Sequence, residues 1–178
     1  MNPIPEEAVR KACGDRSFPE LGKIEQRWRT NPIPSEKVAA EASDAISTLH
    51  LDQCPPGGEV AVSAGSRGIA NLSAIIRGVV DGLRDRGYDP FVFPAMGSNG
   101  GATDEGQRKK LATLGVTPET VGCEIRSSMA VEKIGTTPER DVPVYADANA
   151  VAADAIIVVN RIKPHTDFSG DVESGLSK

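Results

Sequence analysis

The feature that most constrains the fold is an alternation, from Glu59 onward, of short apolar segments with longer amphipathic ones. Short apolar runs bounded by glycine or proline are typical of buried strands, and apolar residues at helical spacing are typical of surface helices. Strands and helices in alternation predict a parallel sheet covered by helices. We therefore expect an α/β fold with a Rossmann-like parallel or mixed sheet, flanking helices and an N-terminal helical arm. The expected strands are 59–65, 89–97 and 155–160, the expected helices between them are 66–87 and 104–115, and paired edge strands are expected at 127–137 and 141–147.

The first part of the chain differs from this pattern because it is rich in proline and charge and poor in β-branched residues. The spacing of its apolar residues predicts two helical pieces, at 5–13 and 35–50. The sequence PPGG at 55–58 is typical of a loop and marks a boundary. We expect an N-terminal arm over 1–56 and an α/β domain over 57–178.

The composition excludes two classes of partner. The 178-residue chain has a net charge of −5, whereas nucleic acids and anionic membranes bind clustered basic surfaces. Aromatic residues make up only 4% of the chain, too few for stacking on bases. Its apolar runs are shorter than the roughly 20 residues of a membrane span, and the N-terminus lacks the pattern of a secretory signal. The three cysteines form no C-x-x-C pair, so we expect a cytoplasmic protein with neither a disulfide framework nor a zinc site.

Three loops follow the three expected buried strands, and sheets of this kind bind ligands outside the carboxyl ends of their strands. The first loop, GSRGI at 65–69, places Arg67 at a turn from strand to helix. A guanidinium group matches the geometry of a carboxylate or phosphate, and a helix N-terminus favours an anion. An ordinary surface ion pair is the other interpretation of Arg67, and its position alone does not decide between the two.

The second loop, GSNGGAT at 97–103, is rich in glycine. The backbone N–H groups of Gly100 and Gly101 suit close approach to a phosphate. The loop matches neither the P-loop nor the dinucleotide-binding fingerprint. From the residues alone, the favoured interpretation is a turn in which Asn99-Gly100 permits positive φ angles.

The third loop, KPHTDFSG at 163–170, has the sharpest chemical signal. Histidine is the natural acid or base at neutral pH, and His165 follows a proline shortly after a buried strand. Lys163 supplies a charged partner, and the loop is too polar for a structural core histidine. Lys178 is a candidate for covalent attachment or for binding phosphate, with a surface lysine as the alternative. His50, on the expected helix 35–50, is assigned a structural or surface role.

In their order and spacing these segments resemble the N-terminal domain of the lactate racemase family, whose members carry a nickel-pincer nucleotide. The resemblance is to the branch with the motifs GSRGI, PAMGS-x-GGAT-x-EGQ and NRIKPHT-x-F-x-G-x-x-ESGL-x-K. In this chain the motifs are residues 65–69, 94–107 and 160–178, with IRSSM at 125–129 between them. The resemblance covers most of 24–178.

The resemblance implies an isomerase that racemises or epimerises 2-hydroxy acids. A hydride leaves the substrate for the cofactor while a histidine takes the hydroxyl proton, and the resulting keto acid receives the hydride on its other face. By resemblance, Arg67 grips the substrate carboxylate, His165 is one of two catalytic histidines, and Lys178 bonds to the cofactor through a thioamide. We also assign Ser66, Gly100, Gly101 and Lys163 to the binding of the cofactor.

Asn99 stands where the family has its second catalytic histidine. An amide cannot accept a proton at neutral pH, so racemisation with two bases is not expected. The Asn99 amide can instead orient a substrate oxygen in one-sided chemistry. The family's nickel-ligating histidine and its C-terminal domain would lie beyond Lys178, so we expect a truncated domain that has no metal ligand and is inactive alone.

Two other functions stay open from the sequence. A non-catalytic module that binds an anion or a partner is favoured by Asn99 and by the expected lack of a second domain. A phosphotransferase would use the glycine loop as a phosphate cradle, but a GK[ST] sequence and an evident acidic pair for Mg²⁺ are lacking. The sequence leaves the hydroxy acid and the oligomeric state undetermined.

Overall fold

The computed structural model describes residues 5–14, 22–23, 25, 31–66, 68–161 and 170. The chain divides into two compact units, residues 1–32 and 33–178. The first unit contains helix α1, Glu6–Cys13, which buries none of its residues and carries an ion pair between Arg10 and Glu6, one turn apart. The sheet and its flanking helices belong to the second unit.

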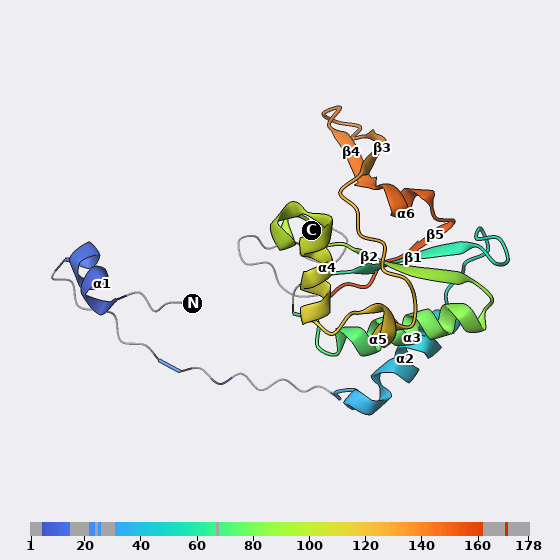
Figure 1. Cartoon of the computed structure of the whole chain (residues 1–178), viewed down its shortest axis with the longest axis horizontal. Coiled ribbons are helices and arrows are strands. Elements are labelled where there is room, and N and C mark those ends of the chain that lie inside the picture. The colour runs from blue at the N-terminus through green and yellow to red at the C-terminus, as the bar shows by residue number, and fades with distance from the viewer. Residues whose placement is uncertain are drawn as a thin grey trace. The chain divides into compact units, whose positions relative to one another are not determined.

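A small parallel sheet forms the centre of the second unit (Figure 1). Its strands are β1, Glu59–Ala64, β2, Asp89–Pro94, and β5, Ala155–Ile157, in the order β2-β1-β5. Strand β1 pairs in parallel with both neighbours, and Val62 lies opposite Val92 of β2. The predicted α/β class is confirmed as a mixed α/β architecture with a three-stranded parallel sheet and flanking helices.

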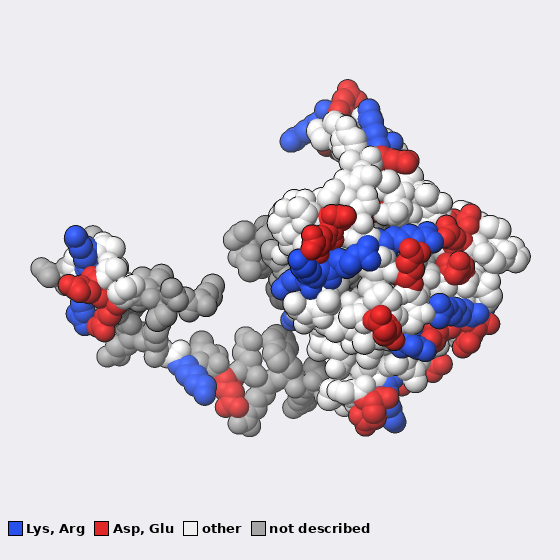
Figure 2. Space-filling view, in the orientation of Figure 1, with Lys and Arg blue, Asp and Glu red and all other residues white. Residues whose placement is uncertain are grey.

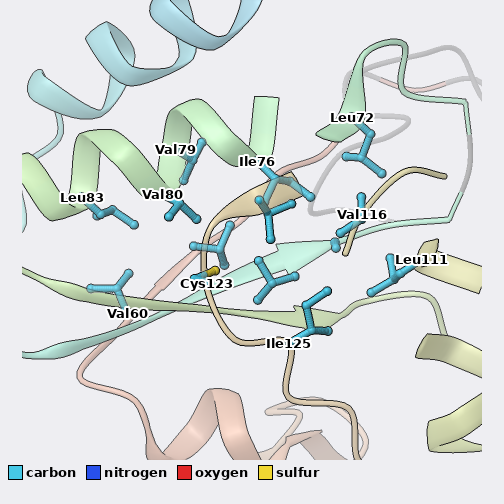
Figure 3. Close-up of a cluster of buried hydrophobic side chains, with 14 of the residues drawn as sticks. Val60, Leu72, Ile76, Val79, Val80, Leu83, Leu111, Val116, Cys123 and Ile125 are labelled. Atoms are coloured by element: carbon cyan, nitrogen blue, oxygen red, sulfur yellow. The ribbon is translucent and has the colours of Figure 1, made fainter. Parts of the chain in front are cut away.

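Helix α3, Leu72–Asp85, covers one face of this sheet. Its apolar residues recur at helical spacing and form one stripe, which packs against β1 and β2 because burial removes that surface from water. The helix begins at Leu72 rather than at residue 66, because Gly68 and Asn71 have positive φ angles that a helix does not admit. Figure 3 shows the resulting cluster, whose members include Val60, Leu72, Ile76, Val79, Val80, Leu83, Leu111, Val116, Cys123 and Ile125.

A second layer of helix covers α3. The 3-10 turn η1, Ser35–Lys37, leads into α2, Val38–Ser47, which packs along α3 and buries Ile46 in the same core. The predicted boundary at residues 56/57 therefore differs from the observed division after Pro32. The physical reason is that α2 needs the surface of α3 to bury its apolar stripe.

The other face of the sheet has a smaller cluster. Ala61, Phe91 and Phe93 point to this face and meet Ala150 of the short helix α6, Ala148–Ala152. The expectation that strand β5 is buried is wrong. Ile156 of β5 lies on the same face as Ala61 and is 47% exposed. The cover over this face ends before it reaches the outer strand.

A hairpin stands apart from the sheet (Figure 1). It consists of β3, Val131–Thr136, and β4, Pro143–Asp147, in antiparallel pairing with an irregularity between Lys133 and Gly135. The predicted pairing of these two segments is confirmed. Its exposed apolar side chains are Val131, Ile134, Val144 and Tyr145.

The polypeptide leaves β2 through the 3-10 segment η2, Asn99–Ala102, and enters helix α4, Asp104–Thr113. A one-turn helix, α5, Pro118–Val121, follows and lies near α3. In the part of the chain that the structure describes, no helix has the length and apolar character needed to cross a membrane.

Candidate functional site at the carboxyl edge of the sheet

The loops after the three strands meet at one edge of the sheet because parallel strands end there together. Ala95 continues the pairing beyond β2, since its N–H donates to the carbonyl of Ala64 at 2.8 Å. After β5, the N–H of Val159 donates to the hydroxyl of Ser63 at 3.0 Å. Ser63 is a buried polar residue of β1, so its hydroxyl gains a partner and also holds the segment that follows β5.

A direct bond joins the first loop to the third. The guanidinium of Arg161 donates through Nη1 to the carbonyl oxygen of Gly68 at 2.7 Å. A charged donor makes this bond stronger than one between neutral groups. Gly68 has a φ of 61°, and a Cβ added there would come within 2.8 Å of Arg161 Nη1. Glycine at this position therefore permits both the turn and the approach of the arginine.

The glycine loop after β2 is held by hydrogen bonds within itself. Asn99 donates through its amide Nδ2 to the carbonyl of Met96 at 2.8 Å. Gln107, a buried polar residue of α4, donates through Nε2 to the carbonyl of Gly97 at 2.8 Å. Gly100 and Gly101 have φ values of 74° and 72°, so the loop has the positive φ angles that its glycines permit.

Two of these glycines have different surroundings. A Cβ on Gly100 would overlap the backbone of Gly106 and Gln107, so Gly100 serves the packing of the loop against α4. A Cβ on Gly101 would meet nothing within 4 Å. The backbone at Gly101 thus remains open to a ligand, whereas that at Gly100 is used by the fold.

The start of α4 is not an evident site for phosphate. Thr103 caps the helix, because its hydroxyl accepts from the N–H of Gly106 at 3.1 Å. The first turn then carries two exposed carboxylates, Asp104 and Glu105. Anions favour helix N-termini, but these carboxylates already place negative charge there. The geometry thus disfavours a phosphate cradle at this turn.

The structure describes half of the predicted site residues. Ser66, half-buried, lies in the loop after β1, and Asn99, Gly100 and Gly101 lie in the loop after β2. These four are therefore at the carboxyl edge. The other four, Arg67, Lys163, His165 and Lys178, lie outside the described residues.

Two residues of this edge, Arg161 and Gln107, were not predicted as site residues from the sequence. Both lie within motifs quoted above, NRIKPHT and EGQ. Each acts through a backbone carbonyl, and carbonyls are present at every position. The only available signal was the presence of a long polar side chain beside a glycine-rich loop.

A small polar pocket lies at the opposite end of the strands, where β1 and β2 begin. It is lined by Arg84, Asp89, Pro90, Phe91, Glu124 and Arg126. The Arg126 guanidinium lies 4.0 Å above the centre of the Phe91 ring. It also bonds Glu59 at 2.7 Å and Glu124 at 2.9 Å, so its charge is already compensated within the protein. This pocket is therefore a weaker candidate for an anion than the carboxyl edge.

Charges of both signs occur together on the surface. Figure 2 shows a short band of basic side chains across one face, with acidic side chains on both sides of it. Exposed neighbours form ion pairs, for example Lys109 with Glu105 at 2.6 Å. Polyanions are steered by an extended area of positive charge. This face does not present such an area, because acidic side chains flank the basic ones.

Metal ligands and relatives give no further information on the site. Within the described ranges, no group of three or more histidine, cysteine, aspartate or glutamate residues is placed to hold a metal ion. Comparisons with protein-family models, curated proteins and solved structures found no match.

Proposed function

We propose that this chain is the N-terminal domain of a racemase or epimerase of 2-hydroxy acids, with a Rossmann-like sheet. The observation that carries the proposal is the convergence of the three motif-bearing loops at one edge. The bond between Arg161 and Gly68 joins the loop of GSRGI to the start of NRIKPHT. The bond between Ala95 and Ala64 holds the start of the glycine loop against the same edge.

The residue types of these loops suit a hydroxy acid. In the proposal, Arg67 binds the carboxylate through two parallel hydrogen bonds, which fixes the substrate's orientation. His165 takes the hydroxyl proton as the alcohol becomes a ketone and returns it in the reverse step. One hydride and one proton leave the substrate and both return, so the reaction needs no net oxidant.

Asn99 restricts the proposed chemistry to a single base. One amide hydrogen is used on Met96, and the amide retains a second hydrogen and a carbonyl oxygen for other partners. Asn99 therefore serves to orient a substrate oxygen, and His165 alone moves the proton.

The family's cofactor, a nickel-pincer nucleotide, supplies a hydride acceptor when bound. In the proposal it is held by Lys178, with Ser66, Gly101 and Lys163 beside it. The described residues do not form a nickel site by themselves, and Gly100 is engaged in packing against Gly106.

Binding tests the proposal in the chain as it stands. Both enantiomers of a 2-hydroxy acid should bind, because a racemase must accept both, and Arg67→Ala should weaken both by about tenfold or more. Lactate is the simplest probe, and propionate is its matched control without the hydroxyl. Calorimetric titration that finds equal affinity for lactate and propionate, or no effect of Arg67→Ala, would overturn the proposal.

Turnover is tested in a protein that carries the cofactor. Racemisation should retain the substrate hydrogen at the reacting carbon in deuterated water, since that hydrogen moves as a hydride and returns. His165→Ala should lower the rate by about 100-fold or more. Incorporation of solvent deuterium at that carbon would indicate proton abstraction instead.

The second candidate is a non-catalytic module that binds small anions or a partner. It is favoured by one observation, the use of the Asn99 amide to close its own turn on Met96. Its signature would be hydroxy-acid binding that depends on Arg67 but gives no interconversion of enantiomers in the cofactor-loaded protein.

A further inference from the structure

We propose that Arg161 is a positioning residue that holds the loop after β1 in the conformation needed to bind an anionic substrate. The inference rests on the proposed function, because it assigns Arg161 a role through Arg67. It also makes a separate claim about the order of the loop, which does not depend on that function.

Within the described residues, the loop after β1 is also held by the hydrogen bond from Asn71 Nδ2 to the Ser35 hydroxyl, which is long at 3.4 Å. Gly68, immediately after Arg67 in sequence, adopts a left-handed conformation with a φ of 61°. Such a residue has several accessible conformations in a flexible loop. The 2.7 Å bond from Arg161 Nη1 fixes the Gly68 carbonyl and thereby restricts the backbone on the C-terminal side of Arg67.

Arg161 is itself anchored to the sheet. Its own N–H donates to the side-chain oxygen of Asn160 at 2.7 Å. Two residues earlier, Val159 is bound to the hydroxyl of Ser63. Ser63 is only 3% exposed and lies inside β1. A continuous path thus leads from the buried strand through Val159 and Arg161 to Gly68.

Arg161 approaches Gly68 closely, and Gly68 has a backbone conformation that favours glycine. A Cβ on residue 68 would lie 2.8 Å from Arg161 Nη1, and an alanine at this position would have an unfavourable positive φ. Gly68→Ala should therefore disturb the same contact as Arg161→Ala. Two substitutions 93 positions apart then report on one interaction.

A double-mutant cycle separates positioning from direct binding. In the full chain, Arg161→Ala should weaken lactate binding by about tenfold, and Arg161→Lys should restore most of it because lysine keeps one charged donor. In the Arg67→Ala background, Arg161→Ala should have almost no further effect, because its role acts through Arg67. Additive losses would show that Arg161 contacts the ligand itself and would overturn the proposal.

A matched control is available in Arg86, which also donates to backbone carbonyls, those of Ile46 and Leu49. Arg86→Ala should lower the melting temperature and leave the affinity for lactate unchanged. An equal loss of affinity in Arg86→Ala would mean that Arg161→Ala reports only general destabilisation, which would overturn the proposal.

Backbone order parameters from ¹⁵N relaxation keep this inference separate from the proposed function. The order parameters of the amides of residues 68 and 69 should fall from the range of rigid backbone toward that of a flexible loop in Arg161→Ala and Gly68→Ala, with or without a ligand. If wild-type protein fails to bind lactate but shows this change, the proposed function fails and the ordering of the loop by Arg161 stands. Unchanged order parameters in both variants would overturn the inference.

Discussion

At the scale of single residues, Glu59 makes the fold sensitive to pH. Its carboxylate accepts a hydrogen bond from Arg126, which is the main reason that the pKa of Glu59 is lowered. A carboxyl group with a lowered pKa stabilises the folded state above its unfolded pKa, and this stability is lost as pH falls through the folded pKa. Glu59→Gln should therefore lower the unfolding free energy at pH 7 by less than about 1 kcal/mol, because the pair is partly exposed.

Denaturation of wild type and Glu59→Gln at decreasing pH measures this effect. The difference between the two proteins should shrink once the pH falls below the ordinary pKa of glutamate and approaches the lowered value in the fold. Glu105→Gln is the matched control, because its partner Lys109 is 75% exposed and the pair contributes little. A Glu59→Gln difference that persists in acid would contradict the assignment.

The cysteines differ in exposure and therefore in reactivity. Burial raises the pKa of the Cys123 thiol to about 11, and burial also raises the pKa of Cys54. Because the thiolate is the reactive form, only Cys13, which is exposed, should react rapidly with a thiol reagent near pH 8. Labelling followed by mass spectrometry should find one fast site in the native protein and three after unfolding. Rapid native labelling of Cys123 would contradict the packing of the core in Figure 3.

At the scale of elements, the contact between α2 and α3 depends on Gly78. A Cβ there would overlap the carbonyl of Ala39. Within a helix, replacing glycine by alanine normally stabilises by roughly 0.5–1 kcal/mol, but here overpacking should destabilise by about 1–3 kcal/mol. The sign of the change in unfolding free energy thus tests the contact.

Gly135 in β3 is the matched control for this substitution. A Cβ at Gly135 would meet nothing within 4 Å, so Gly135→Ala should change the unfolding free energy by no more than about 0.5 kcal/mol. Stabilisation by Gly78→Ala would show that α2 and α3 do not pack as described.

Elements with a local pattern could be predicted from the sequence, and those that depend on distant partners could not. The stripe of α3 and the cap of α4 at Thr103 are encoded by neighbouring residues. The single turn of α5 is too short to show a period. The exposure of Ile156 depends on which element covers the second face of the sheet, and strand periodicity does not contain that information.

At the scale of the whole molecule, the carboxyl edge could be predicted because it follows from topology. Three parallel strands end together, so their loops are neighbours whatever their sequences. The internal bonds of that edge could not be predicted. Arg161 and Gln107 both bind backbone carbonyls. Every residue has such a carbonyl, so the sequence does not indicate which one accepts the bond. The division after Pro32 was also missed, because it depends on the packing of α2.

The most direct test of the account is a titration of the ¹⁵N-labelled full chain with lactate, followed by NMR, with propionate as the control. The account predicts that lactate shifts a single set of amides, in the loops at 65–69, 97–103 and 159–161, and that propionate shifts them much less. Arg67→Ala should remove the response. Shifts confined to the pocket around Arg84 and Arg126, or equal responses to both acids, would contradict a hydroxy-acid site at the carboxyl edge.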